Sequence, residues 1–77
     1  MYIWRIALEE HWSDDEPGEY NDMLGILRFA APTFESAVEK AKKYAMKGRS
    51  FVDDEGKKQN IVDVRVVSVE RDGSLDG

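Results

Sequence analysis

The chain has 77 residues and a formal net charge of −5, and it contains no cysteine. A chain of this length accommodates one domain (1–77) with a small core and little room for a deep active-site cavity, and the lack of cysteine excludes disulfides, thiolate metal ligands and thiol nucleophiles. An acidic chain repels nucleic-acid backbones and anionic membranes. The sequence shows no leader pattern and no apolar run near the roughly 18 residues that a membrane span needs. We therefore expect a cytoplasmic location.

The N-terminal segment is predicted to be a strand over residues 2–10. Large apolar residues alternate there with a mixed set, which is typical of a half-buried strand. The two faces carry Tyr2, Trp4, Ile6 and Leu8 on one side and Ile3, Arg5, Ala7 and Glu9 on the other. Residues 10–22 have no apolar period and contain Pro17-Gly18, a turn signal because Pro presets φ and Gly tolerates a positive φ. We expect an acidic loop there.

A second strand is predicted over residues 23–31, where apolar residues again alternate. Its two faces carry Leu27, Phe29 and Ala31 on one side and Leu24, Ile26 and Arg28 on the other. A helix follows over about residues 34–47, because apolar residues repeat there at 3.6-residue spacing. Thr33 is a suitable N-cap, and Gly48 suits the left-handed position after the helix.

The C-terminal part supplies the last strands. Phe51-Val52 is predicted to be a short edge strand, and the β-branched run 61–70 a long one with a bulge at Val66-Val67. Residues 73–77 are expected to fray. A right-handed crossover through the helix makes the last strand parallel to the second and antiparallel to the first. The sequence therefore predicts an α+β fold, in which a three- to four-stranded antiparallel sheet has its first strand in the centre and one helix on one face.

The loop over residues 10–22 is the first candidate site. Aromatic side chains in it would supply contact area, and its carboxylates would attract a basic partner. The residues assigned to this role are Trp12, Asp14, Asp15, Glu16 and Tyr20. The alternative is a solvated loop whose two aromatic side chains fold back on the edge of the core.

The sheet face that points away from the helix, called here the open sheet face, is the second candidate. One helix leaves this face uncovered, and exposed apolar area often marks association. It is expected to carry three arginines, Arg5, Arg28 and Arg65, which could bind carboxylates or phosphates of a partner. The alternative is a solvated face with cross-strand Arg–Glu and Arg–Asp pairs. Its other expected members are Ile3, Ala7, Glu9, Leu24, Ile26, Ile61, Asp63 and Val67.

No catalytic or metal-binding pattern is evident in the sequence. Residues 14–18 lack the alternating oxygen ligands and distal Glu of an EF-hand. His11 is the only histidine, and nothing in the sequence near it marks a substrate or a catalytic partner. We expect neither an enzyme nor a cofactor or metal site. The helix lysines are expected to be solvent-facing partners of Glu35 and Glu39.

Two stretches of the C-terminal two-thirds are distinctive. They are Ala31-Pro32-Thr33-Phe34-Glu35-Ser36-Ala37 with Lys40-Ala41, and Val66-Val67-Ser68-Val69-Glu70-Arg71-Asp72-Gly73. This text resembles small uncharacterised phage and prophage proteins with the order strand, strand, helix, strand. The resemblance implies a cytoplasmic accessory protein that acts by binding, and it transfers no catalytic residue.

The leading hypothesis is a non-enzymatic protein-binding accessory module, encoded by a phage or mobile element. It would meet a basic or nucleic-acid-binding protein through the loop, the open sheet face or both, and its acidic surface could make it inhibitory. One alternative is a structural homodimer through the open sheet face. Another is a small RNA-binding domain, although the aromatic residues Tyr2 and Trp4, which base stacking would need, are expected on the helix side.

Overall fold

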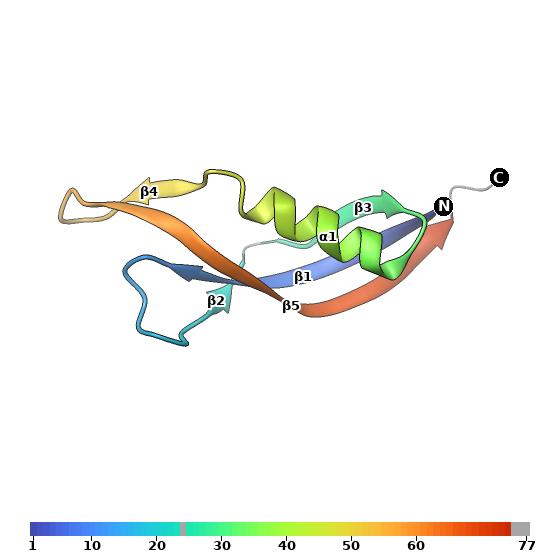
Figure 1. Cartoon of the computed structure of the whole chain (residues 1–77), viewed down its shortest axis with the longest axis horizontal. Coiled ribbons are helices and arrows are strands. Elements are labelled where there is room, and N and C mark those ends of the chain that lie inside the picture. Colours follow the sequence, from blue (N-terminus) through green and yellow to red (C-terminus); the bar gives the residue numbers. More distant parts are fainter. Residues whose placement is uncertain (24, 75–77) are drawn as a thin grey trace.

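Two long antiparallel strands form the centre of the sheet. A computed structural model of the chain describes residues 1–23 and 25–74. β1 (Tyr2–Trp12) pairs with β5 (Lys58–Ser74) from one end of β1 to the other, and the Cα trace extends over 51 × 20 × 17 Å (Figure 1). The remaining elements are β2 (Asn21–Asp22), β3 (Leu27–Ala31), α1 (Phe34–Ala45) and β4 (Ser50–Val52).

The predicted α+β class, with an antiparallel sheet and one helix, is confirmed. β1 is central, since β5 lies along one of its edges while β2 and β3 share the other. β4 pairs with β5 and completes the order β2-β1-β5-β4. The sheet has five strands rather than three or four because the predicted loop 10–22 is partly sheet. β1 continues to Trp12, and Asn21 and Asp22 pair with its Glu10 and Glu9, which reduces the loop to residues 13–20.

Several predicted boundaries were wrong. β3 begins at Leu27 rather than at residue 23, after Gly25 adopts a positive φ of 87° that a strand does not accommodate. β5 runs to Ser74, so Gly73 and Ser74, which were expected to fray, pair with the start of β1 instead. The other predicted tail residues, 75–77, and Leu24 lie outside the described residues.

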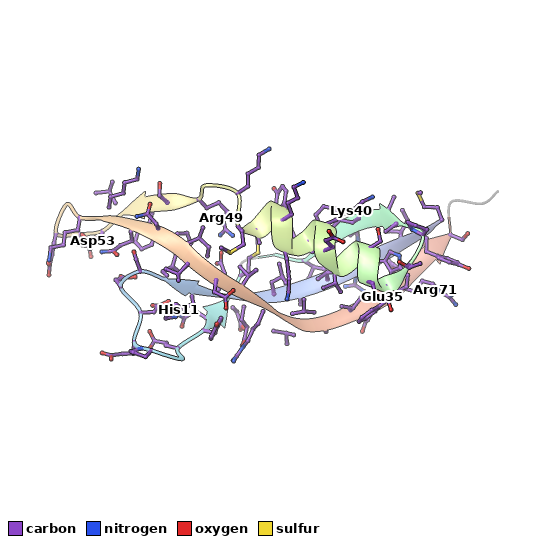
Figure 2. All side chains as sticks on the ribbon, in the orientation of Figure 1. His11, Glu35, Lys40, Arg49, Asp53 and Arg71 are labelled. Carbon is purple, nitrogen blue, oxygen red and sulfur yellow. The ribbon has the colours of Figure 1, made fainter. Side chains whose placement is uncertain are left out.

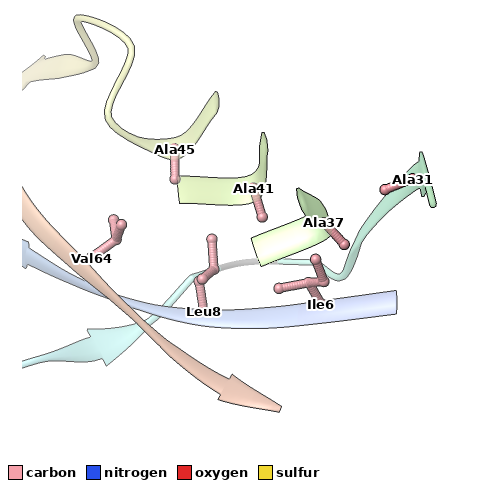
Figure 3. Packing of buried hydrophobic residues seen from close by; sticks show 7 residues of the cluster. All are labelled: Ile6, Leu8, Ala31, Ala37, Ala41, Ala45 and Val64. Carbon is pink, nitrogen blue, oxygen red and sulfur yellow. The ribbon is translucent and has the colours of Figure 1, made fainter. Parts of the chain in front are cut away.

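The core lies between α1 and the even-numbered side of β1, as the alternation predicted. Ile6 and Leu8 are 0% and 3% exposed, and Trp4 packs against them while its Nε1 donates to Ala31 O at 3.0 Å. Figure 3 shows the helix alanines directed at Ile6 and Leu8. The buried apolar residues are Ile6, Leu8, Ala31, Ala37, Ala41, Ala45 and Val64.

The helix contributes only alanine to the buried core. The N-cap prediction is confirmed, since Ser36 N–H donates to Thr33 Oγ1 at 3.2 Å. A stripe of alanines lets α1 lie close to the sheet, but it leaves the large helical side chains of Phe34 and Tyr44 half exposed. α1 covers the part of the sheet near the start of β1, and β4 with its hairpin extends beyond the helix (Figure 1).

Three bulges interrupt the alternation of β5. Register shifts opposite β1 leave Val62, Val67 and Asp72 without a partner in β1, so the predicted bulge at Val66-Val67 is confirmed. The bulge at Val62 was not predicted, and it reverses the parity of the strand before it. Ile61 therefore packs against the core instead of lying on the open sheet face, and Val62 is 50% exposed.

Candidate functional site

The three arginines of the open sheet face are held by acidic side chains of the same chain. Two of these pairs join residues that lie directly opposite each other on β1 and β5. The pairs are Arg5–Glu70 at 3.7 Å, Arg28–Asp72 at 3.5 Å and Arg65–Glu9 at 2.6 Å. Cross-strand pairing, the alternative arrangement for this face, is therefore what the structure contains. Arg5 Nε is buried and has no hydrogen-bond partner in the described part of the chain.

Trp12 is placed on the helix side, at the end of β1. Its ring meets Phe51 edge-on at 5.0 Å, and the Arg49 guanidinium lies 5.4 Å from its centroid. The Trp12 N–H donates to Asp15 Oδ2 at 2.7 Å, so Asp15 closes the turn that follows β1. Two of the five predicted loop residues therefore have structural roles.

Tyr20 is placed on the opposite side, against the open sheet face. Its hydroxyl donates to Asp63 Oδ2 at 2.5 Å, Arg65 lies 4.4 Å from the ring centroid, and the His11 ring is 5.4 Å away. The hydrogen bond from Tyr20 holds the pKa of Asp63 below its ordinary value, and the same bond raises the pKa of Tyr20. Tyr20 thus attaches the loop to the open sheet face, and not to the edge of the core where the alternative placed both aromatic side chains.

Asp14 and Glu16 are the predicted loop residues that remain free. Both are exposed, and neither forms an ion pair within residues 1–23 and 25–74. Neither forms an ion pair with an arginine of the open sheet face, since the partners of those arginines are Glu9, Glu70 and Asp72. The eight predicted site residues are therefore divided between two sides of the sheet and a loop.

A surface that the sequence analysis did not single out surrounds the C-terminal end of α1. Two hollows open to solvent adjoin there, one of about 580 Å³ and the other of about 470 Å³. Tyr44 and Lys47 line both, so we treat them together as the helix-end groove. The first hollow is lined by Phe29, Lys40, Lys43, Tyr44, Met46 and Lys47, and the second by Glu10, Trp12, Met23, Tyr44, Lys47 and Arg49.

The first hollow has an apolar floor and a basic rim. The rings of Phe29 and Tyr44 meet edge-on at 5.9 Å, and Tyr44 and Met46 are 54% and 37% exposed. Three lysines form the rim: Lys40 and Lys43 of α1, and Lys47, which follows the C-terminal end of the helix. The helix lysines are exposed as expected, but no ion pair joins them to Glu35 or Glu39 in the described part of the chain.

The second hollow contains an ion pair in which the carboxylate is buried and the guanidinium is partly exposed. Glu10 is 7% exposed, and Arg49 donates to its carboxylate and also, at 3.1 Å, to Ala45 O at the end of α1. Figure 2 shows Arg49 between the end of α1 and β4. Because the two opposite charges neutralise each other, the free charge at the groove comes from the lysines.

The spacing of Lys40, Lys43, Tyr44 and Lys47 was visible in the sequence, but the position of Phe29 beside these residues depends on where β3 pairs.

No protein-family model, curated protein or solved structure matches the chain. The resemblance to phage and prophage proteins therefore stays a prediction. Among the described residues, no three His, Asp or Glu side chains are grouped so that they could hold a metal ion, and no helix is long and apolar enough to cross a membrane.

Proposed function

We propose that the chain is a non-enzymatic protein-binding module and that its contact surface is the helix-end groove. The observation that carries the proposal is the exposed apolar floor. Tyr44 and Met46 stay accessible beside a helix whose buried stripe is entirely alanine. Exposed large apolar side chains grouped in a hollow and bordered by charges are typical of interaction sites.

The shape of the groove favours a macromolecular partner over a small molecule. Sites for small ligands usually bury about 70–90% of the ligand surface, and catalytic sites exclude water. Both hollows here are open to solvent and lie side by side along one helix end. A partner that lies across Tyr44 and Lys47 would contact both hollows at once.

The open sheet face and the loop, which the sequence suggested as contact surfaces, are less available to a partner than the helix-end groove. The arginines of the open sheet face are paired within the chain, and the side chains of Asp15 and Tyr20 form hydrogen bonds that hold the loop. A partner at those places would have to compete with existing contacts. At the first hollow of the groove the apolar side chains are already exposed, so binding there requires no such exchange.

Affinity capture with matched variants tests the proposal. The chain is immobilised and exposed to a lysate of the cells in which it is made, and bound proteins are quantified by mass spectrometry. The groove variant carries Tyr44→Ser with Met46→Ser, and the control carries Val62→Ser with Val67→Ser at two exposed bulge positions of β5. Circular dichroism verifies that both variants fold.

We expect a protein that binds the native chain and the control but is depleted at least about tenfold on the groove variant, since large central apolar side chains dominate binding energy. A protein that is lost from the control and retained by the groove variant would place the contact on β5. That result would reject the groove as the contact surface.

A further inference from the structure

We infer that the helix-end groove binds an acidic segment of a partner protein, one in which carboxylates are interspersed with large apolar side chains. The partner chemistry rests on the proposed function at the same groove. It adds the sign of the partner's charge, which is opposite to the basic or nucleic-acid-binding partner that the overall acidity of the sequence favoured.

The charge of the groove is the first argument. The whole chain has a formal net charge of −5, yet the rim of the first hollow consists of Lys40, Lys43 and Lys47. Lys43 and Lys47 have no ion-pair partner in the described part of the chain, and Lys40 Nζ donates to a neutral acceptor, Ala30 O, at 2.8 Å. The rim therefore presents uncompensated positive charge, which attracts carboxylates and orients them before contact.

The floor of the groove is the second argument. Phe29, Tyr44 and Met46 form an apolar surface that the three lysines border. A purely ionic partner would leave this surface wet, whereas apolar side chains of a partner would cover it and displace its water. The matching ligand therefore combines both chemistries: apolar groups for the floor and carboxylates for the rim.

Other polyanions fit the chain less well. Nucleic acids and anionic lipid surfaces extend their charge far beyond the groove, where the excess of carboxylates, Asp14 and Glu16 among them, would repel them. A second copy of this chain offers its own acidic loop, residues 13–20. The large side chain of that loop, Tyr20, is already held by Asp63 and Arg65. The loop therefore lacks a free apolar group for the floor.

Peptide binding by the full chain tests the ligand chemistry. Fluorescence anisotropy is measured with a short peptide of Glu mixed with Leu and Phe, with the same peptide carrying Lys for Glu, and with the same peptide carrying Ser for Leu and Phe. A single-stranded RNA oligomer and anionic phospholipid vesicles are the further probes. We expect only the first peptide to bind, with an affinity that falls severalfold between low salt and about 0.3 M salt.

Two charge variants locate the binding. Lys43→Glu with Lys47→Glu reverses the rim, and Lys57→Glu with Lys58→Glu makes the same change at the β4–β5 hairpin. Both variants have a net charge of −9, because each substitution subtracts two from −5. We expect the rim variant to weaken peptide binding by about tenfold or more at low salt and the hairpin variant by less than about twofold.

The outcomes separate the two proposals. Equal weakening by both variants, or binding of the Lys-containing peptide or of RNA, overturns the acidic-segment inference. Self-association of the native chain, seen as a concentration-dependent mass in light scattering and abolished in the rim variant, also overturns it, since the occupant of the groove would then be a second copy of the chain. A captured partner that depends on Tyr44 and Met46 but contacts the groove through a basic or neutral segment would also overturn it, while the proposed function would stand. If no captured protein depends on those residues, the proposed function itself fails.

Discussion

Replacing Arg49 by Met tests the ion pair at the base of the groove. Glu10 is 7% exposed, and Arg49 is its ion-pair partner within the described residues. Breaking a buried pair by removing one member costs about 3–5 kcal/mol, because the remaining charge stays buried without compensation. The Arg49 side chain is 29% exposed, so water can reach part of the site and we expect the lower end, about 3 kcal/mol. A cysteine-free chain of this size has about 3–5 kcal/mol in total, so the Arg49→Met protein should be near its unfolding midpoint in water.

Urea denaturation followed by tryptophan fluorescence measures the effect. The cycle comprises Arg49→Met, Glu10→Leu and the double variant, which replaces the pair by apolar side chains. We expect the double variant to recover more than about 1 kcal/mol relative to the sum of the single variants, since it leaves no unpaired charge behind. Additive costs would show that the two charges are not coupled, and the reasoning from the burial of Glu10 would then be refuted.

Three further predictions concern the core, the loop and the helix end. Ile6→Ala removes most of the largest fully buried side chain and should lower the free energy of unfolding by about 2–5 kcal/mol, enough to unfold most of the protein. Ile6→Val should lower it by about 1 kcal/mol. A loss below about 2 kcal/mol for Ile6→Ala in urea denaturation would contradict the core assignment. Tyr20→Phe removes the hydrogen bond that lowers the pKa of Asp63. The lowered pKa of Asp63 should therefore stabilise the native chain at pH values above the ordinary Asp pKa, and this stability should be lost as the pH falls through the lowered pKa. The urea midpoint, measured between about pH 2 and 7, should fall less on acidification for Tyr20→Phe than for the native chain. Gly48→Ala should lower the free energy of unfolding by about 1 kcal/mol, because Gly48 has a φ of 55°, which alanine adopts only with strain. Gly73→Ala in β5 is the control and should leave the stability unchanged. Equal thermal midpoints for the two variants would show that the positive φ of Gly48 is not needed at the helix end.

Local periodicity determined much of the fold. The alternation of Trp4, Ile6 and Leu8 predicted which side of β1 meets the helix, and the structure confirms it. Thr33 and the 3.6-residue spacing after it located α1 to within two residues. These features depend on neighbours in the chain, so a pattern read along the sequence contains the information they need. The same stretch contained the three lysines of the groove, although their significance was not apparent without the strand beside them.

Tertiary structure decided where the side chains of different elements meet. Trp12 and Tyr20 were predicted to lie in one loop, but Trp12 belongs to β1 and lies on the helix side, while Asp63 holds Tyr20 on the opposite side. The bulge at Val62 reversed the predicted side of Ile61, because a single extra residue changes the parity of a strand. Whether a strand bulges, and which residues it opposes, depends on the summed packing of distant segments, and no short window of sequence contains that sum. The same holds for the groove, whose floor requires Phe29 of β3 to lie beside Tyr44 of α1.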